Sequence, residues 1–204
     1  MKALLIVDVQ NDFLPGGALA VPDGDLIIPI INGLQQKFTF VVATQDWHPA
    51  THGSFAINHT GKKPGDFVKL DGLDQILWPA HCVQGSFGAE FHQDLQKNQW
   101  NRVFQKGTDP QVDSYSGFYD NNRKGDTGLS AYLKKFKINE VFVVGLATDY
   151  CVKFTVLDAL KDGFKTTLIS DATKAVNLEA GDFEKALEEM QQAGARIIVS
   201  REII

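Results

Sequence analysis

Residues 140–170 read EVFVVGLATDYCVKFTVLDALKDGFKTTLIS, and this stretch contains the repeating unit of the fold. It starts and ends with apolar runs that lack polar alternation, which is typical of strands buried on both faces of a sheet. Between these runs, apolar residues recur at helical spacing up to Leu160, and Gly163 follows where a helix C-cap is expected. A strand, a helix and a second strand in this order predict a parallel sheet with right-handed crossovers.

The same alternation runs along most of the chain. Six apolar runs are predicted as strands, at residues 3–7, 39–44, 102–105, 140–145, 165–170 and 196–200. Helical spacing predicts helices near residues 26–34, 129–136, 152–160 and 183–190. Together they predict an α/β protein with a three-layer, doubly wound, mainly parallel sheet of six strands and helices on both faces.

One segment departs from this alternation. Residues 45–101 are too many for a simple crossover, are rich in Gly, Pro, His and Trp, and show only one weak helical pattern, at 89–95. Long irregular insertions in compact domains are usually functional. Because the chain shows no linker or internal repeat, we expect a single domain over residues 1–204 with a functional insertion at about 45–101.

Composition excludes several classes of protein. The 20 Lys and Arg residues stand against 25 Asp and Glu residues, and the net charge of −5 argues against a nucleic-acid partner or an anionic membrane surface. No stretch approaches the roughly 18 apolar residues of a membrane span. Two cysteines are too few for a disulfide framework, and we expect a cytoplasmic protein. The sequence does not set the oligomeric state, and a homo-oligomer is compatible with it.

Reactive side chains follow four of the predicted strands. Asp8 ends the first, Asp46 and His48 end the second, Lys106 ends the third, and Cys151 lies in the turn after the fourth. Ligands bind at the carboxyl ends of strands in open α/β sheets, and all of these side chains would project from that edge. The alternative is that each is an ordinary polar residue at a strand end.

The position of Cys151 favours a nucleophile. A thiol at the start of a helix is near free N–H groups and the positive end of the helix dipole, which stabilise a thiolate and could hold an oxyanion. No histidine lies at a strand end beside it, so Asp8 is the candidate base and Lys106 the candidate group that lowers the thiol pKa. Otherwise Cys151 is a small buried residue, Asp8 a turn residue and Lys106 a solvated lysine. Cys82 lacks such a setting and is interpreted as structural.

Asp46 and His48 are the candidate start of a metal site. Two residues apart in an extended segment, their side chains point to the same side and could share an ion. A third ligand must come from the insertion, where His81 and His52 are the candidates. A mixed nitrogen and oxygen site with open positions suits zinc, iron or manganese. The alternative is a set of hydrogen-bonded loop residues.

Five blocks of sequence, in order, resemble a known family. They are IVDVQNDFLPGGAL (6–19), TQDWHPATHGSFA (44–56), LWPAHCVQGSFGAEFH (77–92), FQKGTDPQVDSYSGF (104–118) and VVGLATDYCVKFTVLDAL (143–160). These blocks are similar to those of the nicotinamidases among the isochorismatase-like cysteine hydrolases, and the resemblance covers nearly the whole chain. It implies an amidohydrolase that converts nicotinamide to nicotinate and ammonia through a Cys thioester in NAD salvage, with pyrazinamide as a further substrate.

The resemblance also implies roles for particular residues. The family's catalytic Asp, Lys and Cys correspond to Asp8, Lys106 and Cys151. Its ligands for one divalent metal ion correspond to Asp46, His48 and His81, although some relatives use a histidine near His52.

Further residues are implied around the nucleophile. The family's cis peptide corresponds to Leu146–Ala147, which would make the amides of Ala147 and Cys151 the oxyanion hole. On this interpretation Phe13 and Trp78 clamp the aromatic ring of the substrate, and Leu19 and Tyr115 complete the wall. The alternative for these four residues is core packing.

Rival functions are weaker. Hydrolases of carbamoyl or ureido groups lack a metal held through DWH and WPxHC, and isochorismate hydrolases typically lack the nucleophilic cysteine. A dinucleotide-binding module would need a GxGxxG turn that GGAL does not supply. A catalytically silent binding protein would normally have lost a member of the catalytic set.

Overall fold

The computed structural model describes residues 1–203 and has a six-stranded central sheet in the order β5-β2-β1-β6-β7-β8. All five pairings between neighbouring strands are parallel, which confirms the predicted sheet. The strands are β1 (Lys2–Val7), β2 (Val41–Asp46), β5 (Trp100–Lys106), β6 (Glu140–Leu146), β7 (Lys165–Lys174) and β8 (Arg196–Ile198).

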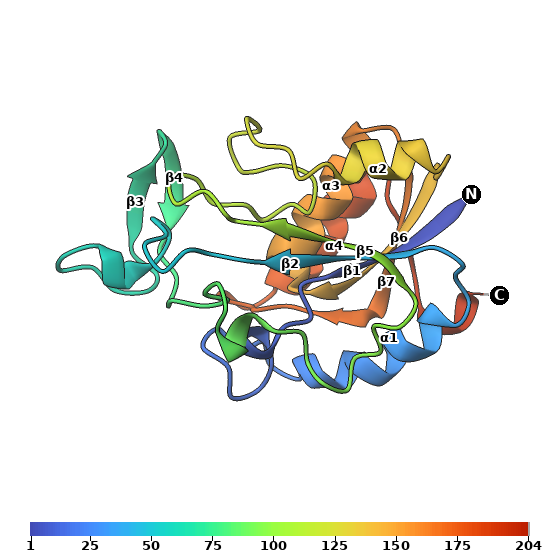
Figure 1. The fold of residues 1–204 in the computed structure, drawn as a ribbon, viewed down its shortest axis with the longest axis horizontal. Helices are drawn as coiled ribbons and strands as arrows, with labels where there is room; N and C mark the ends of the chain where they lie inside the picture. The colour runs from blue at the N-terminus through green and yellow to red at the C-terminus, as the bar shows by residue number, and fades with distance from the viewer. Residues whose placement is uncertain (204) are drawn as a thin grey trace.

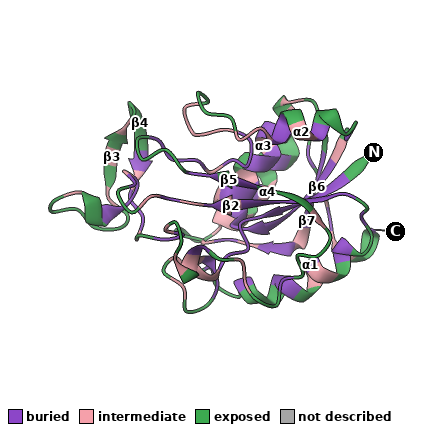
Figure 2. Ribbon diagram, viewed as in Figure 1, coloured by how far each residue is buried: buried purple, intermediate pink, exposed green. Residues whose placement is uncertain are grey.

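Helices cover both faces of this sheet, as expected from the sequence (Figure 1). One face is covered by α1 (Ile27–Gln35), and the other by α2 (Leu129–Lys135), α3 (Lys153–Lys161) and α4 (Asp182–Gln192). Strand β1 shows why helices must cover both faces of the sheet, because successive side chains of a strand point to opposite sides and its apolar side chains therefore need partners on each face. Leu4 and Ile6 pack in the core on the α1 side, whereas Leu5 and Val7 pack in the core beneath the other three helices. Buried residues accordingly fill the central strands in Figure 2.

The segment between β2 and β5 adds no strand to the central sheet. It carries an antiparallel hairpin of β3 (Phe67–Leu70) and β4 (Leu73–Ile76), which lies beyond the carboxyl ends of the central strands in Figure 1. Its two-residue turn is Asp71-Gly72, and both residues have positive φ, as a hairpin turn of this type requires. The sequence interpretation missed this hairpin, although an Asp-Gly pair between short apolar runs is its usual signal.

The predicted helix at 89–95 is wrong. The chain makes only a short 3-10 turn, Phe87–Ala89, before it becomes extended. Residues after that turn bond to the segment that follows β1, since the amide of Asn11 donates to the carbonyl of Glu90 and that of His92 to the carbonyl of Val9. These long-range hydrogen bonds replace the local bonds that a helix would need.

The helix predicted at 152–160 is also preceded by an irregular turn. A π-helical turn spans Thr148–Val152 and leads into α3. Cys151 therefore lies just before the regular helix. Among residues 1–203, no helix combines the length and apolar character needed to cross a membrane.

Gly145 permits the close approach of β6 to β1. Its φ is +115°, and a Cβ at this position would lie 2.0 Å from the carbonyl oxygen of Val7. Any side chain here would therefore push apart the two central strands that carry the residues described below.

We expect Gly145→Ala to lower the free energy of unfolding by about 3 kcal/mol or more, because it combines an unfavourable φ with a backbone clash. Chemical denaturation would measure this loss. Gly163→Ala is the matched control, since Gly163 also has positive φ but no atom lies within 4 Å of the added Cβ. The control should lose only about 1 kcal/mol, and equal losses in the two variants would contradict the clash.

Candidate active site and metal centre

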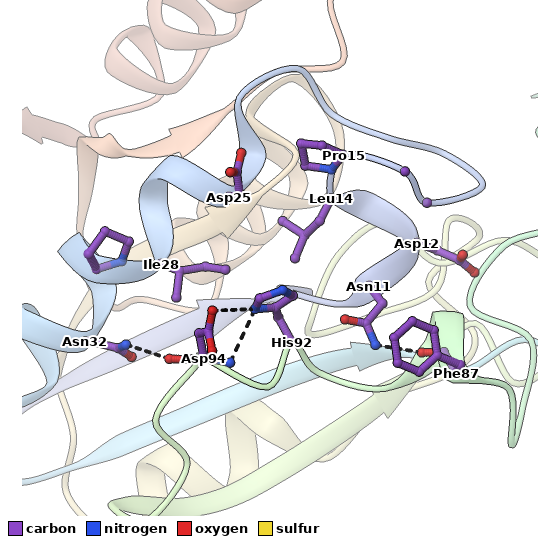
Figure 3. A pocket seen from close by; sticks show the side chains of 13 residues that line it. Asn11, Asp12, Leu14, Pro15, Asp25, Ile28, Asn32, Phe87, His92 and Asp94 are labelled. Carbon is purple, nitrogen blue, oxygen red and sulfur yellow. Dashed lines mark hydrogen bonds and ion pairs between the residues drawn. The ribbon is translucent and has the colours of Figure 1, made fainter.

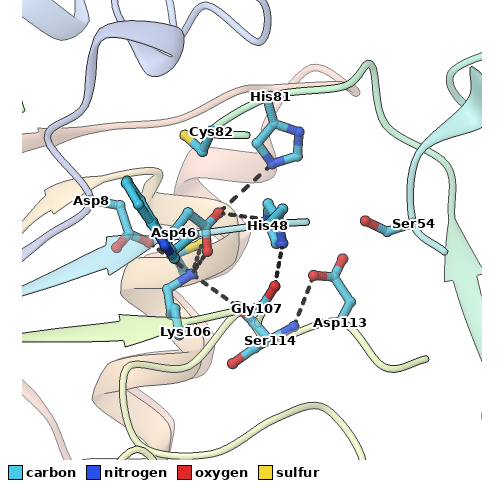
Figure 4. Close-up of polar contacts among 12 residues, drawn as sticks. Asp8, Asp46, His48, Ser54, His81, Cys82, Lys106, Gly107, Asp113 and Ser114 are labelled. Atoms are coloured by element: carbon cyan, nitrogen blue, oxygen red, sulfur yellow. Dashed lines mark hydrogen bonds and ion pairs between the residues drawn. The ribbon is translucent and has the colours of Figure 1, made fainter. Parts of the chain in front are cut away.

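The side chains predicted at the strand ends meet at one edge of the sheet (Figure 4). Asp8 follows β1, Asp46 and Lys106 end β2 and β5, and Cys151 lies in the turn after β6. Each of the four is at most 6% exposed. One carboxylate oxygen of Asp8, one of Asp46 and the sulfur of Cys151 lie within 4.8 Å of one another.

Lys106 lies at the centre of this group. Its Nζ is 2.9 Å from Oδ2 of Asp8 and 2.5 Å from Oδ1 of Asp46, and it also donates to the carbonyl of Ser114 at 2.8 Å. The sulfur of Cys151 is 3.4 Å away. A buried ammonium with these partners is not the solvated lysine that the sequence left as an alternative.

The contact between Lys106 and Asp46 was missed by sequence reasoning, which paired Lys106 with Asp8 alone. The sheet explains it, since Asp46 and Lys106 stand opposite each other in the β2–β5 register. The sequence did not reveal that these two strands are neighbours.

Burial dominates the electrostatics of the acid and the thiol. It raises the pKa of Asp8 above its usual value, although the charge of Lys106 opposes this shift. Burial also raises the pKa of the Cys151 thiol well above its usual value, and Lys106 offsets only part of that shift. Lys106 thus acts on the thiol pKa in the predicted direction, but the effect of burial is larger. The resting thiol keeps its proton and needs a nearby acceptor to lose it.

Asp46 behaves in the opposite way. Burial alone would raise its pKa, but Lys106 and His48 together lower the pKa well below the usual value. Gln10 fixes the backbone of Asp46, because its side-chain amide donates to the carbonyl of Asp46 at 2.8 Å and accepts from the amide of Asp46 at 2.8 Å. Asp46 is thus a permanently charged carboxylate on an immobilised strand end. The role of Gln10 was not predicted, although it lies in the first family-like block.

His48 and His81 approach this carboxylate with their Nε2 atoms. Those atoms lie 3.3 Å and 3.7 Å from Oδ2 of Asp46. Nδ1 of His48 is 2.8 Å from the carbonyl of Gly107, and Nδ1 of His81 is 2.8 Å from the carbonyl of Pro79. A carbonyl only accepts, so each Nδ1 carries a proton, and Nε2 is the nitrogen through which each ring would bind a metal ion.

This donor set fits a metal ion. The two Nε2 atoms and the Asp46 carboxylate all face the same place, and their ligand atoms lie within 4.8 Å of one another. Nε2 of His48 makes no hydrogen bond with any residue in 1–203, despite its position beside Asp46. The carbonyls that hold the Nδ1 protons are the partners expected behind metal-binding imidazoles. A divalent cation would satisfy all three atoms at once.

His52 is buried beside His48, with the two ring centres 4.3 Å apart, but it is held differently. Its Nδ1 accepts from the backbone amide of Ser54 at 3.2 Å, so Nδ1 carries the lone pair and Nε2 carries the proton of the neutral ring. Burial lowers the pKa of His52 to about 4, which keeps the ring neutral. In this protonation state Nε2 of His52 has no lone pair for a metal. His81 stays the predicted third ligand. Nε2 of His52 is likewise without a hydrogen-bond partner among residues 1–203, and His48, His52 and Asp113 form a second candidate group.

A narrow pocket lies beside Asp46 and Cys151. Its wall includes the four residues predicted for substrate binding, and its base includes Asp46, His81, Ala147 and Cys151; the predicted wall residues are Phe13, Leu19, Trp78 and Tyr115. Three further lining residues, Asp113, Tyr150 and Val176, were not predicted. Phe13, Leu19 and Tyr115 also pack against the hydrophobic cores, so these side chains contribute to core packing as well as to the pocket lining.

Ala147 follows β6 at the base of this pocket. The Leu146–Ala147 peptide bond is cis, as the family resemblance implied. The Ala147 carbonyl accepts from the amides of Tyr150 and Val152, at 3.1 Å each, and so turns into the π-helical turn. The backbone of Ala147 is thereby fixed next to Cys151.

A second cavity, of about 640 Å³, lies on the α1 side of the molecule (Figure 3). It is bordered by polar side chains that include Asn32, His92 and Asp94. None of the residues predicted for catalysis or metal binding lines it. The chemistry described here therefore belongs to the narrow pocket.

Comparison with known proteins places this geometry in a family. Residues 2–202 match the isochorismatase domain family. The nicotinamidase of Escherichia coli K12 is 51% identical over 200 residues, which cover 96% of this chain and 93% of that protein.

Two solved structures are similar as well. A nicotinamidase and pyrazinamidase from Acinetobacter baumanii is 50% identical with a TM-score of 0.96, and the match covers 100% of this chain and 98% of the other. The pyrazinamidase of Pyrococcus horikoshii in complex with zinc is 41% identical with a TM-score of 0.79, over 97% and 98% of the two chains. The chain therefore belongs to the isochorismatase family and, within it, to the nicotinamidases.

Proposed function

We propose that this protein hydrolyses nicotinamide to nicotinate and ammonia through a thioester on Cys151. The observation that carries this proposal is the contact of Lys106 with Asp8, Asp46 and Cys151 at the base of an aromatic-walled pocket. The nicotinamidase relatives support the choice of substrate. Their close match also favours this reaction over the carbamoyl or ureido hydrolases and the silent binding protein.

In the first half of the reaction, Asp8 takes the proton of the Cys151 thiol. Its raised pKa suits a group that must accept this proton and later release it. The sulfur then attacks the carboxamide carbon, and the amides of Ala147 and Cys151 hold the oxyanion. Lys106 stabilises the thiolate as it forms and keeps the two neighbouring carboxylates in place. Asp8 then returns the proton to the departing ammonia, which leaves an acyl group on the sulfur.

In the second half, water attacks the thioester with Asp8 again as the base. The C–S bond breaks, nicotinate leaves and Cys151 regains its proton from Asp8. Phe13 and Trp78 hold the flat ring between them, while Leu19 and Tyr115 close the wall. The rigid base of the pocket sets the carboxamide against the sulfur, so the attack becomes effectively intramolecular.

We also propose that Asp46, His48 and His81 hold one divalent metal ion, either zinc, iron or manganese. When bound, this ion supplies a Lewis acid that orients the pyridine nitrogen of the substrate. The zinc in the pyrazinamidase of Pyrococcus horikoshii supports such a site. Two of the three ligands flank the narrow pocket, so the ion would lie at its edge.

We further propose a domain organisation, a second substrate, a metabolic role and a cellular location. Residues 1–204 form a single hydrolase domain, and the insertion at about 45–101 supplies His81 and Trp78 to the site. Pyrazinamide, an aromatic carboxamide of similar size, is a second substrate. A place in NAD salvage follows from the product. The cytoplasmic location rests on cysteine usage, and both cysteines are free thiols.

Replacing the nucleophile should abolish the reaction. We expect Cys151→Ala to reduce ammonia release from nicotinamide by about 10³-fold or more, since no other group in the pocket can form the thioester. A coupled ammonia assay measures this loss. Cys82→Ala is the matched control, because Cys82 is also buried but lies outside the pocket lining. Full activity in Cys151→Ala would rule out the covalent mechanism.

The metal centre makes a separate prediction. Elemental analysis should find about one first-row metal ion per purified chain and close to none in His81→Ala or Asp46→Ala, because each variant removes one of three ligands. Asp74→Ala is the control, since this exposed carboxylate forms an ion pair with the exposed Lys69 and with no other side chain among residues 1–203. Variants of both ligands that keep their metal would show that the assignment of Asp46 and His81 is wrong.

A further inference from the structure

One buried side chain of the β3–β4 hairpin makes hydrogen bonds to residues that line the narrow pocket. Leu73 and Asp74 of β4 are exposed, and Ile76 is half-buried, whereas Gln75 between them is only 4% exposed. A buried carboxamide must have its donors and acceptors satisfied inside the protein. Its partners therefore show what the hairpin is tied to.

Nε2 of Gln75 lies among three oxygen atoms. It is 2.7 Å from the carbonyl of Ile76, 2.9 Å from Oδ2 of Asp113 and 3.0 Å from the hydroxyl of Tyr115. The carbonyl and the carboxylate can only accept, so the nitrogen of the carboxamide must face them. The orientation of Gln75 is thus fixed by its surroundings. Two of the three partners, Asp113 and Tyr115, line the pocket.

The hydroxyl of Tyr115 links Gln75 to Trp78, because both side chains lie within hydrogen-bond distance of it. The indole Nε1 of Trp78 donates to the same oxygen at 3.2 Å. The Tyr115 hydroxyl therefore accepts from Trp78 and lies within hydrogen-bond distance of Gln75, whose two N–H groups are shared among three oxygen atoms. Tyr150 packs against both rings, with ring centres 4.9 Å from Trp78 and 5.4 Å from Tyr115. The carboxamide of Gln75 is thus one of the contacts that join a connected set of three aromatic side chains.

Asp113 is fixed from two sides in the same network. Its Oδ1 accepts from the amide of Ser114 at 2.8 Å, and its Oδ2 accepts from Gln75. The carbonyl of Ser114 in turn accepts from Lys106. Hydrogen bonds therefore connect Gln75 to Lys106 through Asp113 and Ser114. Gln75 makes no direct hydrogen bond to Asp8, Lys106 or Cys151.

We propose that Gln75 is a positioning residue, through which the β3–β4 hairpin orients Trp78 and Tyr115 to bind the aromatic ring of the substrate. This inference rests on the proposed nicotinamide hydrolysis. Loss of the carboxamide should weaken substrate binding more than it slows the chemical step. Gln75 contacts the aromatic wall directly, whereas it reaches Lys106 only through Asp113 and Ser114.

The test compares the kinetics of Gln75→Leu, which keeps the size of the side chain but removes its donors, with those of the wild type. We expect KM for nicotinamide to rise by about tenfold, as for the loss of one or two hydrogen bonds, with kcat within about twofold. Asp74→Leu is the matched control on the same hairpin, and its KM should not change. A fall in kcat at constant KM, or no change in either constant, would overturn the proposal.

A second readout does not depend on activity. The indole N–H signal of Trp78 in a ¹H–¹⁵N spectrum should shift in Gln75→Leu and in Tyr115→Phe, and should stay in place in Asp74→Leu. In the wild type, the two side-chain amide protons of Gln75 should exchange slowly with solvent, which can be measured even where Gln75→Leu does not fold. Rapid exchange of these protons would contradict the proposal. A wild type that releases no ammonia from nicotinamide would instead contradict the proposed function.

Discussion

The site depends on a single buried ammonium shared by two carboxylates. Lys106, at the end of β5, contacts both Asp8, which follows β1, and Asp46, which ends β2. Burying three charges brings little net stability, yet removing one partner would cost about 3–5 kcal/mol because it leaves an uncompensated charge. The main contribution of Lys106, Asp8 and Asp46 is therefore to fix the positions of the side chains at the site, and not to stabilise the fold. Their arrangement places carboxylate oxygens of Asp8 and Asp46 and the sulfur of Cys151 within 4.8 Å of one another.

The same ammonium separates two carboxylates that would otherwise behave alike. Asp46 faces His48 and His81 as well as Lys106, and its pKa is held well below the usual range. Asp8 has one cationic neighbour and complete burial, and its pKa is raised. One carboxylate is thus suited to permanent charge beside a metal ion and the other to proton transfer. The environments, and not the residue type, divide the two tasks.

The central sheet and the insertion at about 45–101 each contribute residues to the site. The sequence predicted the residues at the strand ends, but it did not predict the path of the insertion. The residues at the strand ends could be found because apolar runs mark the strands and each polar side chain follows directly. The insertion could not be traced in this way. A helix predicted at 89–95 gave way to hydrogen bonds with residues 9–11, and the β3–β4 hairpin with Gln75 was missed. Asp113 was also overlooked, since nothing in its neighbourhood in the sequence points to a partner 38 positions away.

By itself the sequence determined the parallel α/β architecture, the chemistry available at the strand ends and, through five blocks in order, the family. Each of these follows from local pattern, which depends on near neighbours in the chain. The tertiary structure alone decided that β5 lies beside β2, and so brought Lys106 to Asp46 across 60 residues of chain. It also decided which nitrogen of each histidine carries the proton. These outcomes depend on burial and on contacts between distant segments, which exist only after the sheet order and the path of the insertion are set.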